Sequence, residues 1–294
     1  AKGEKFEICG QVITTPRANR VILATRPEGI IMGFSSTIEE HLPQLGKELD
    51  VAFMAGYHYA PTAKEELEPY LASSMASIHR LKEENPRLRF HFEYVPMNDA
   101  QAEETMLRAV ASEIQSFGIN ENEIKRVLTV LGYESECAEI EAHERAYCLY
   151  KGCARIMEEL GFERIQLHNL GYYVVLLKKP YPLDPLHVRE SCLYASAVNA
   201  IKAKYGGYVL HEQLVEAGEI PLSDVGFSQL RTFGEEMRNH GFYIPANFEE
   251  EGILELDDHY VLIVPAHIVP NPVSTVGMGD TISSSAFAYE WNRL

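Results

Sequence analysis

The order of the predicted strands and helices constrains the fold of this chain most strongly. Short apolar segments that favour strands alternate with longer segments that favour helices along its 294 residues. The strands are expected at residues 7–14, 20–25, 51–56, 88–95, 164–168, 172–177 and 260–264. The helices are expected at 36–49, 63–84, 99–117, 121–131, 137–160, 188–205 and near the C-terminus. This alternation predicts an α/β fold, with a mostly parallel central sheet and helices on both faces.

The composition excludes some partners. The chain has 43 acidic residues against 26 lysines and arginines, a formal net charge of −17, which argues against nucleic acid and anionic membranes as partners. No apolar stretch reaches the length of a membrane-spanning helix. The five cysteines are scattered and form no C-x-x-C pair, which favours reduced thiols and a cytoplasmic location.

The sequence Gly277-Met278-Gly279-Asp280 lies between a predicted strand and the final helix. Glycines leave room for a phosphate to approach main-chain N–H groups, and a helix start adds partial positive charge. Asp280 would then be a base beside an anion site, as phosphoryl transfer to a hydroxyl requires. A plain structural interpretation is a loop in which Asp280 caps the helix.

Two further polar motifs lie upstream. His91 and Glu93 are two residues apart on a predicted strand, so they share one face of it; an exposed edge strand is the structural alternative. Asn120 and Glu123 open a predicted helix after Gly118, with the spacing of a capping box. On these patterns alone, local structure is a better explanation of the second pair than function.

The C-terminal run from Ser274 to Ser284, Ser-Thr-Val-Gly-Met-Gly-Asp-Thr-Ile-Ser-Ser, resembles the closing motif of the ribokinase-like superfamily. Within that superfamily, this run is most similar to the motif of the ADP-dependent sugar kinases, which are the ADP-specific glucokinases and phosphofructokinases. His91-x-Glu93 and Asn120-x-x-Glu123 resemble the H-x-E and N-x-x-E motifs of these kinases and occur in their order. The resemblance implies that ADP is the phosphoryl donor, with Mg²⁺ near Glu93, Glu123 and Asp280. It also implies that Asn120 lies near the nucleotide phosphates.

The resemblance extends to other nucleotide contacts. His168 and Asn169 stand where the family has a His-Thr pair that contacts ADP, so the threonine is replaced here by asparagine. Val269 matches a position that lines the adenine pocket; a core valine is the alternative. Arg20, or in its place Arg17, matches an arginine that reaches the transferring phosphate; exposed surface arginines are the alternative.

The resemblance covers nearly the whole chain from about residue 11, yet the N-terminal third of complete family members has no counterpart here. That segment supplies the first strands, much of a smaller lid domain and most sugar contacts. We therefore expect residues 1–25 to be residual lid or connecting strands and residues 26–294 to be the nucleotide-binding catalytic domain. Nothing in residues 1–10 replaces that segment, so we expect it to have been removed or left out, or to be supplied by a second chain.

The expected function is transfer of the β-phosphate of ADP to glucose or fructose 6-phosphate, between which the sequence does not decide. Two other functions stay open: an ATP-dependent ribokinase-like kinase, and a nucleotide-binding protein without turnover.

Overall fold

The computed structural model describes residues 5–8, 10–14 and 34–292. The chain divides into two units, Ala1–Met32 and Gly33–Leu294. In the first unit, β1 (Lys5–Ile8) and β2 (Gln11–Thr14) form an antiparallel hairpin. The expected single strand over residues 7–14 is wrong, because Gly10 adopts a φ of 76° and reverses the chain. The expected strand at 20–25, and with it the expected domain boundary, falls outside the described residues.

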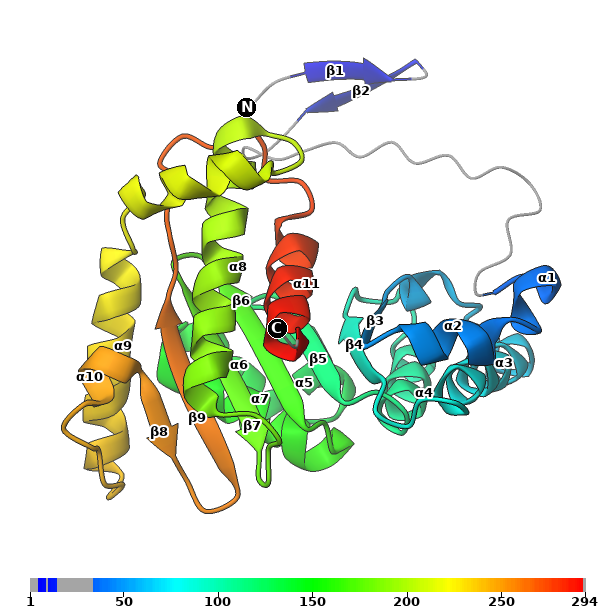
Figure 1. Ribbon diagram of the computed structural model, residues 1–294, viewed down its shortest axis with the longest axis horizontal. Helices are drawn as coiled ribbons and strands as arrows, with labels where there is room; N and C mark the ends of the chain where they lie inside the picture. Colours follow the sequence, from blue (N-terminus) through cyan, green and yellow to red (C-terminus); the bar gives the residue numbers. More distant parts are fainter. Residues whose placement is uncertain (1–4, 9, 15–33, 293–294) are drawn as a thin grey trace. The chain divides into compact units, whose positions relative to one another are not determined.

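The second unit is built on a seven-stranded sheet in the order β3-β4-β5-β6-β7-β9-β8 (Figure 1). Strands β3 to β6 are parallel, and β7 and β8 are antiparallel to their neighbours. Strand β9 therefore runs in the same direction as β6, so five of the seven strands share one direction, as the sequence predicts. The strands are β3 (Val51–Met54), β4 (Arg89–Glu93), β5 (Ser116–Asn120), β6 (Arg164–Asn169), β7 (Tyr172–Lys178), β8 (Ile253–Glu255) and β9 (His259–Pro265).

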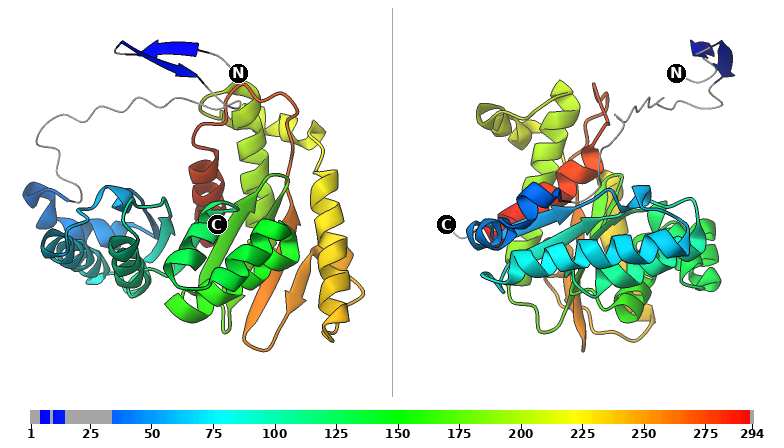
Figure 2. Two further views of the ribbon diagram at one scale, coloured as in Figure 1. Left: turned by 180° about the vertical axis from the view of Figure 1, so that it is seen from behind. Right: turned by 90° about the vertical axis from the view of Figure 1, so that its right-hand side faces the viewer.

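Helices cover both faces of this sheet (Figures 1 and 2). On one face, α8 and α11 pack side by side over β9 and over β3 to β6. The bounds of these two helices are α8 (Pro185–Tyr205) and α11 (Met278–Trp291). The helices on the other face are α3 (Lys64–Lys82), α4 (Ala100–Ala111), α5 (Glu123–Val130), α6 (Glu134–Ala142), α7 (Ala146–Leu160) and α9 (Asp224–Asn239). Shorter elements complete the unit: α1 (Ser36–Glu39), α2 (Leu42–Glu48), η1 (Tyr57–Tyr59), η2 (His211–Glu219) and α10 (Phe248–Glu251).

Alternating side chains divide the core between the two faces. Phe90 and Phe92 of β4 lie in the larger cluster with residues of α3, α4, α5, α7 and α9. His91, between them, faces the opposite way and contacts the ring of Phe287 on α11, with ring centroids 5.4 Å apart. Of the helices in the described residues, none combines the length and apolar character that a membrane crossing needs.

Several expected helix boundaries are wrong. The expected helix at 99–117 ends as α4 at Ala111, and residues 116–120 form β5 instead. Phe117 and Ile119 are fully buried in the core on one face of the sheet, so tertiary burial outweighs helix propensity there. The expected helices at 36–49 and 137–160 are each two helices, and the pairing of β8 with β9 is not apparent from the sequence.

Candidate functional site

Segments that carry the predicted site residues meet at one edge of the sheet. Glu93 is the last residue of β4, Asn120 the last of β5, and His168 lies near the end of β6. The register pairs Glu93 with Gly118 and Asn120 with His168. The loop at 266–277 leaves β9 at the same edge and leads into α11. This is the carboxyl edge of the parallel strands, where ligands of α/β sheets bind.

His91 and Glu93 share one face of β4, as predicted. His91 is completely buried; its Nε2 lies 3.2 Å from Glu93 Oε2 and its Nδ1 lies 2.7 Å from Ser116 Oγ. Arg164 donates from Nη1 to the same Ser116 oxygen at 3.2 Å. Arg164 itself is buried and ion-paired with Glu290 of α11, with Nε and Oε2 2.9 Å apart. A chain of buried hydrogen bonds thus leads from α11 through β6 and β5 to Glu93.

The surroundings of His91 and Glu93 determine which of the two carries a charge. Burial lowers the pKa of His91, and the positive charge of Arg164 adds to this effect, while Glu93 opposes it. Burial raises the pKa of Glu93, but the hydrogen bond from His91 and the nearby imidazoles of His168 and His91 outweigh it, leaving that pKa below its ordinary value. His91 is therefore neutral and donates from Nε2 to an ionised Glu93, while its Nδ1 accepts from the Ser116 hydroxyl.

Two glycines leave the space that Glu93 occupies. A methyl group on Gly118 would lie 2.1 Å from Glu93 Oε2 and 2.6 Å from His91 Nε2. A methyl group on Gly279 would lie 2.9 Å from His168 Nε2 and 3.4 Å from Glu93 Oε1. The first turn of α11 therefore packs directly against Glu93 and His168. The structure thus brings together Gly279, Glu93 and His168, three residues predicted for the site.

Asn120 and Glu123 form the reciprocal hydrogen bonds of a capping box. The Asn120 side-chain oxygen accepts from the N–H groups of Asn122 and Glu123, and Glu123 accepts from the Asn120 N–H, all at 2.9 Å. The predicted local hydrogen bonds are therefore present, but α5 begins only at Glu123, with Asn122 and not Asn120 as its N-cap. This arrangement leaves one Glu123 oxygen without a partner in the described part of the chain. Burial, opposed by the hydrogen bonds from Asn120 and aided by the charge of Glu93, raises the pKa of Glu123 to about 8.

Burial is the largest cause of this rise in pKa, and the negative charge of Glu93 adds to it, so Glu93 and Glu123 repel each other when both are ionised. A cation beside them would relieve this repulsion. Across the described residues, no three His, Cys, Asp or Glu side chains converge so as to hold a metal ion directly. Mg²⁺ is usually held by one or two carboxylates together with water and substrate phosphates. The two carboxylates fit that mode of binding.

The Gly277 loop leaves the first N–H groups of α11 available. Gly277 is the N-cap, with a φ of 65° that favours glycine. Thr281 fixes the turn, since its N–H and hydroxyl donate to the Gly277 carbonyl at 3.1 and 2.7 Å. Within the described ranges, the N–H groups of Met278, Gly279 and Asp280 have no hydrogen-bond partner. These groups form an anion-binding site at a helix N-terminus.

Asp280 does not cap α11. It is the third residue of the helix, it is exposed, and its carboxylate has neither a hydrogen bond nor an ion pair among the residues that the structure describes. The interpretation of Asp280 as an N-cap is therefore wrong. A free carboxylate beside unpaired N–H groups is available to take a proton from a bound hydroxyl.

Sequence analysis misses one basic residue at this edge. Lys202 lies in the last turn of α8, and its Nζ is 3.6 Å from where a methyl group on Gly277 would lie. A sequence signal does exist: Lys202 precedes the predicted helix end at Gly206-Gly207. Basic residues are common in such last turns for purely structural reasons, so the signal is weak.

The structure gives less support to the remaining predicted site residues. The Asn169 amide donates to the Tyr172 hydroxyl at 3.0 Å and its oxygen accepts from the Leu170 N–H at 2.6 Å, so it closes the turn between β6 and β7. Val269 is half-buried in the loop after β9. Their nucleotide contacts stay predictions. Arg20 and Arg17 fall outside the described residues.

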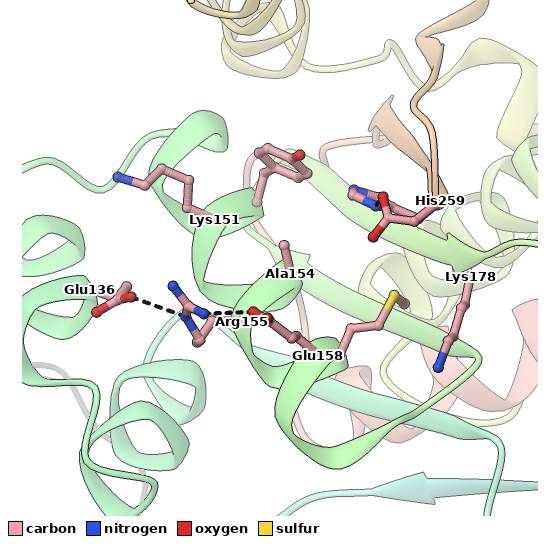
Figure 3. Close-up of a pocket in the computed structure, with 10 residues that line it drawn as sticks. Glu136, Lys151, Ala154, Arg155, Glu158, Lys178 and His259 are labelled. Atoms are coloured by element: carbon pink, nitrogen blue, oxygen red, sulfur yellow. Dashed lines mark hydrogen bonds and ion pairs between the residues drawn. The ribbon is translucent and has the colours of Figure 1, made fainter.

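A pocket of about 500 Å³ lies at the opposite edge of the sheet (Figure 3). Lys178 at the end of β7 and His259 at the start of β9 line it, together with Lys151 and Arg155 of α7. Arg155 is already paired with Glu136 and Glu158. None of the residues predicted from the sequence lines this pocket, so it is separate from the candidate site.

Comparison with known proteins identifies the family of this chain. Residues 1–289 match the family described as the ADP-specific phosphofructokinase/glucokinase conserved region. The chain belongs to this family. It is 32% identical to an ADP-specific phosphofructokinase of Methanosarcina acetivorans over 98% of its own length and 59% of that protein. It is 28% identical to an ADP-dependent glucose/glucosamine kinase of Pyrococcus furiosus over 94% of its own length and 57% of that protein.

Solved structures of this family share the fold. The chain matches the last common ancestor of ADP-dependent phosphofructokinases from Methanosarcinales with a TM-score of 0.86 and 32% identity, covering 99% of this chain and 61% of the ancestor. It matches an ADP-dependent kinase in complex with fructose-6-phosphate and ADPβS with a TM-score of 0.83 and 27% identity, covering 98% of this chain and 70% of that one. This family member thus spans about 60% of the length of the curated relatives that it matches.

Proposed function

We propose that this chain carries the nucleotide site and the base of an ADP-dependent sugar kinase, which transfers the β-phosphate of ADP to a hydroxyl of glucose or fructose 6-phosphate and releases AMP. The observation that supports this most strongly is the free carboxylate of Asp280 beside the unpartnered N–H groups that begin α11. A relative whose structure is described as a complex with fructose-6-phosphate and ADPβS supports the same classes of donor and acceptor.

In this proposal Asp280 is the general base. The acceptor hydroxyl gives its proton to the Asp280 carboxylate while its oxygen bonds to the β-phosphorus. The bond from that phosphorus to the bridging oxygen breaks, and AMP leaves with the electron pair. The N–H groups of Met278, Gly279 and Asp280 stabilise negative charge on the transferring group, and Gly277 allows the phosphate to approach them.

Mg²⁺ is the proposed metal, and when bound it neutralises charge on the phosphate oxygens. Glu93 and Glu123 would hold it, largely through water, and Asp280 is a further ligand that the family resemblance suggests. The His91 hydrogen bond keeps Glu93 ionised and oriented for this role. The mutual repulsion of the two carboxylates supports a cation at this position.

The other nucleotide contacts are proposed from the family resemblance. Asn120 and His168 lie at the carboxyl edge, where they can approach the phosphates. Asn169 and Val269 would contact the rest of ADP, and Arg20 would approach the transferring phosphate from another side. We also propose a cytoplasmic protein, in keeping with its scattered cysteines, which form no C-x-x-C pair.

A second function is nucleotide binding without turnover by this chain alone. The length comparison favours it, because the chain spans only 59% of the first relative, and part of the sugar site would come from sequence outside it. In that case a separate N-terminal polypeptide or a second chain would complete the lid.

The test is calorimetric titration with ADP, AMP and ATP in Mg²⁺, followed by an assay of AMP release with glucose or fructose 6-phosphate. ADP binding with sugar-dependent AMP release establishes the kinase, and Asp280→Asn should then lower turnover at least about 100-fold with little change in ADP affinity. Near-normal turnover of D280N would contradict the base assignment. A preference for ATP would favour the ATP-dependent alternative, and ADP binding without AMP release would favour the non-catalytic one.

A further inference from the structure

The last turn of α8 is joined to the loop that precedes α11. The Val273 N–H donates to the Ala203 carbonyl at 2.7 Å. Gly206 leaves no space for a side chain there, since a methyl group on it would lie 2.6 Å from a Val273 side-chain carbon. Residues at the end of α8 are therefore held at a fixed position beside the Gly277 turn.

Lys202 points from this turn toward the anion-binding end of α11. A methyl group on Gly277 would lie 3.6 Å from Lys202 Nζ and 3.7 Å from Asp280 Oδ2, so the ammonium and the carboxylate face the same small volume. The Lys202 side chain is half-buried and has no ion pair in the part of the chain that is described. By contrast, Lys204 of the same turn is paired with Glu216 at 2.5 Å.

What sets Lys202 apart is its place beside the start of α11, where an anion bound to the main-chain N–H groups would also neutralise its charge. A structural explanation is attraction to the carbonyl end of α8. That explanation applies equally to Lys204, which nevertheless points to a carboxylate. Lys202 lies instead beside Gly277, the residue before three N–H groups that also lack acceptors in the described part of the chain, and the two features together suit a phosphate.

We propose that Lys202 binds the β-phosphate of ADP and neutralises charge on the group that is transferred. This inference rests on the proposed function and deepens it, since it assigns a cation within the described residues to the phosphate. In this arrangement Lys202 donates N–H hydrogen bonds to the phosphate, while Asp280, which faces the same volume, accepts the proton of the acceptor hydroxyl. Lys202 and the N–H groups at the start of α11 together favour binding of a nucleoside diphosphate over the bare nucleoside.

The test compares ADP and adenosine binding by calorimetry for the unmodified chain, Lys202→Ala, Lys202→Gln and Lys202→Arg, without metal and at two salt concentrations. Lys204→Ala is the matched control. Loss of a charged hydrogen bond should weaken ADP binding about 10- to 100-fold in K202A and K202Q, less in K202R, and not in K204A. Adenosine binding should stay within about twofold in every variant, and the salt dependence of ADP binding should fall only in K202A and K202Q, which lose the charge.

Each outcome separates this inference from the function on which it rests. If the unmodified chain binds ADP and the Lys202 variants bind it equally well, the role of Lys202 is wrong while the nucleotide site stands. An equal loss of ADP and adenosine affinity in both uncharged variants would show a structural role and would also overturn the inference. If the unmodified chain does not bind ADP, the proposed function itself fails.

Discussion

Gly118 offers the sharpest test of how the His91–Glu93 pair is positioned. In Gly118→Ala the new methyl group would lie 2.1 Å from Glu93 Oε2 and 2.6 Å from His91 Nε2. The Glu93 carboxylate could swing aside, but the His91 ring is fully buried and hydrogen-bonded on both sides. Overpacking of this kind costs about 1–3 kcal/mol, offset by about 0.4–1 kcal/mol from the less flexible unfolded chain. We expect a net loss of about 1–2 kcal/mol in the free energy of unfolding.

Urea unfolding of G118A measures this loss. Gly218→Ala is the control, because a methyl group on Gly218 would meet nothing within 4 Å; it should change stability by less than about 0.5 kcal/mol. In an E93A background the nearest clash is gone, so G118A should cost at least about 0.5 kcal/mol less than in the unmodified chain. Equal unfolding midpoints for G118A and the unmodified chain would refute the packing argument, and an unchanged cost in E93A would show that Glu93 is not the clashing group.

The pKa of Glu123 and the buried ion pair give two further predictions. Since the pKa of Glu123 is raised from 4.5 to about 8, the folded chain binds more protons than the unfolded chain between these values, and metal-free stability should fall as pH rises through that window. Glu123→Gln should reduce this fall and stabilise the metal-free chain at pH values above 8. If urea unfolding gives the same pH dependence of the free energy of unfolding for E123Q and the unmodified chain, Glu123 is not the source of the fall. Glu290→Gln leaves the buried Arg164 charge uncompensated and should lower the free energy of unfolding by about 3–5 kcal/mol. A loss below about 1 kcal/mol in urea unfolding would contradict that account of the pair.

The sequence predicts the fold well where one local signal dominates. The β4 segment alternates in polarity, so its strand and the shared face of His91 and Glu93 are predictable. The β5 segment contains Gly118, which by local rules ends a helix. Its actual role is to make room for Glu93, a contact with a residue of the neighbouring strand, and no local pattern reveals it.

In the candidate site, too, some residues are predictable from local sequence motifs and others only from tertiary packing. Motif residues such as Glu93, His168 and Gly279 meet because the parallel strands bring their carboxyl ends to one edge. Lys202 comes from a helix on one face of the sheet, and it is indistinguishable in sequence from Lys204, which makes a surface ion pair. Only the packing of α8 against the loop at 266–277 separates their roles.

Hydrogen–deuterium exchange with and without ADP tests the central claim most directly, because it locates the nucleotide on the chain. The account predicts that ADP slows exchange of main-chain amides at residues 120–124 and 277–281, which lie at the carboxyl edge of the sheet. It also predicts no slowing at 151–158, beside the pocket of Figure 3. Slowed exchange confined to residues 151–158, or no change anywhere at saturating ADP, would contradict it.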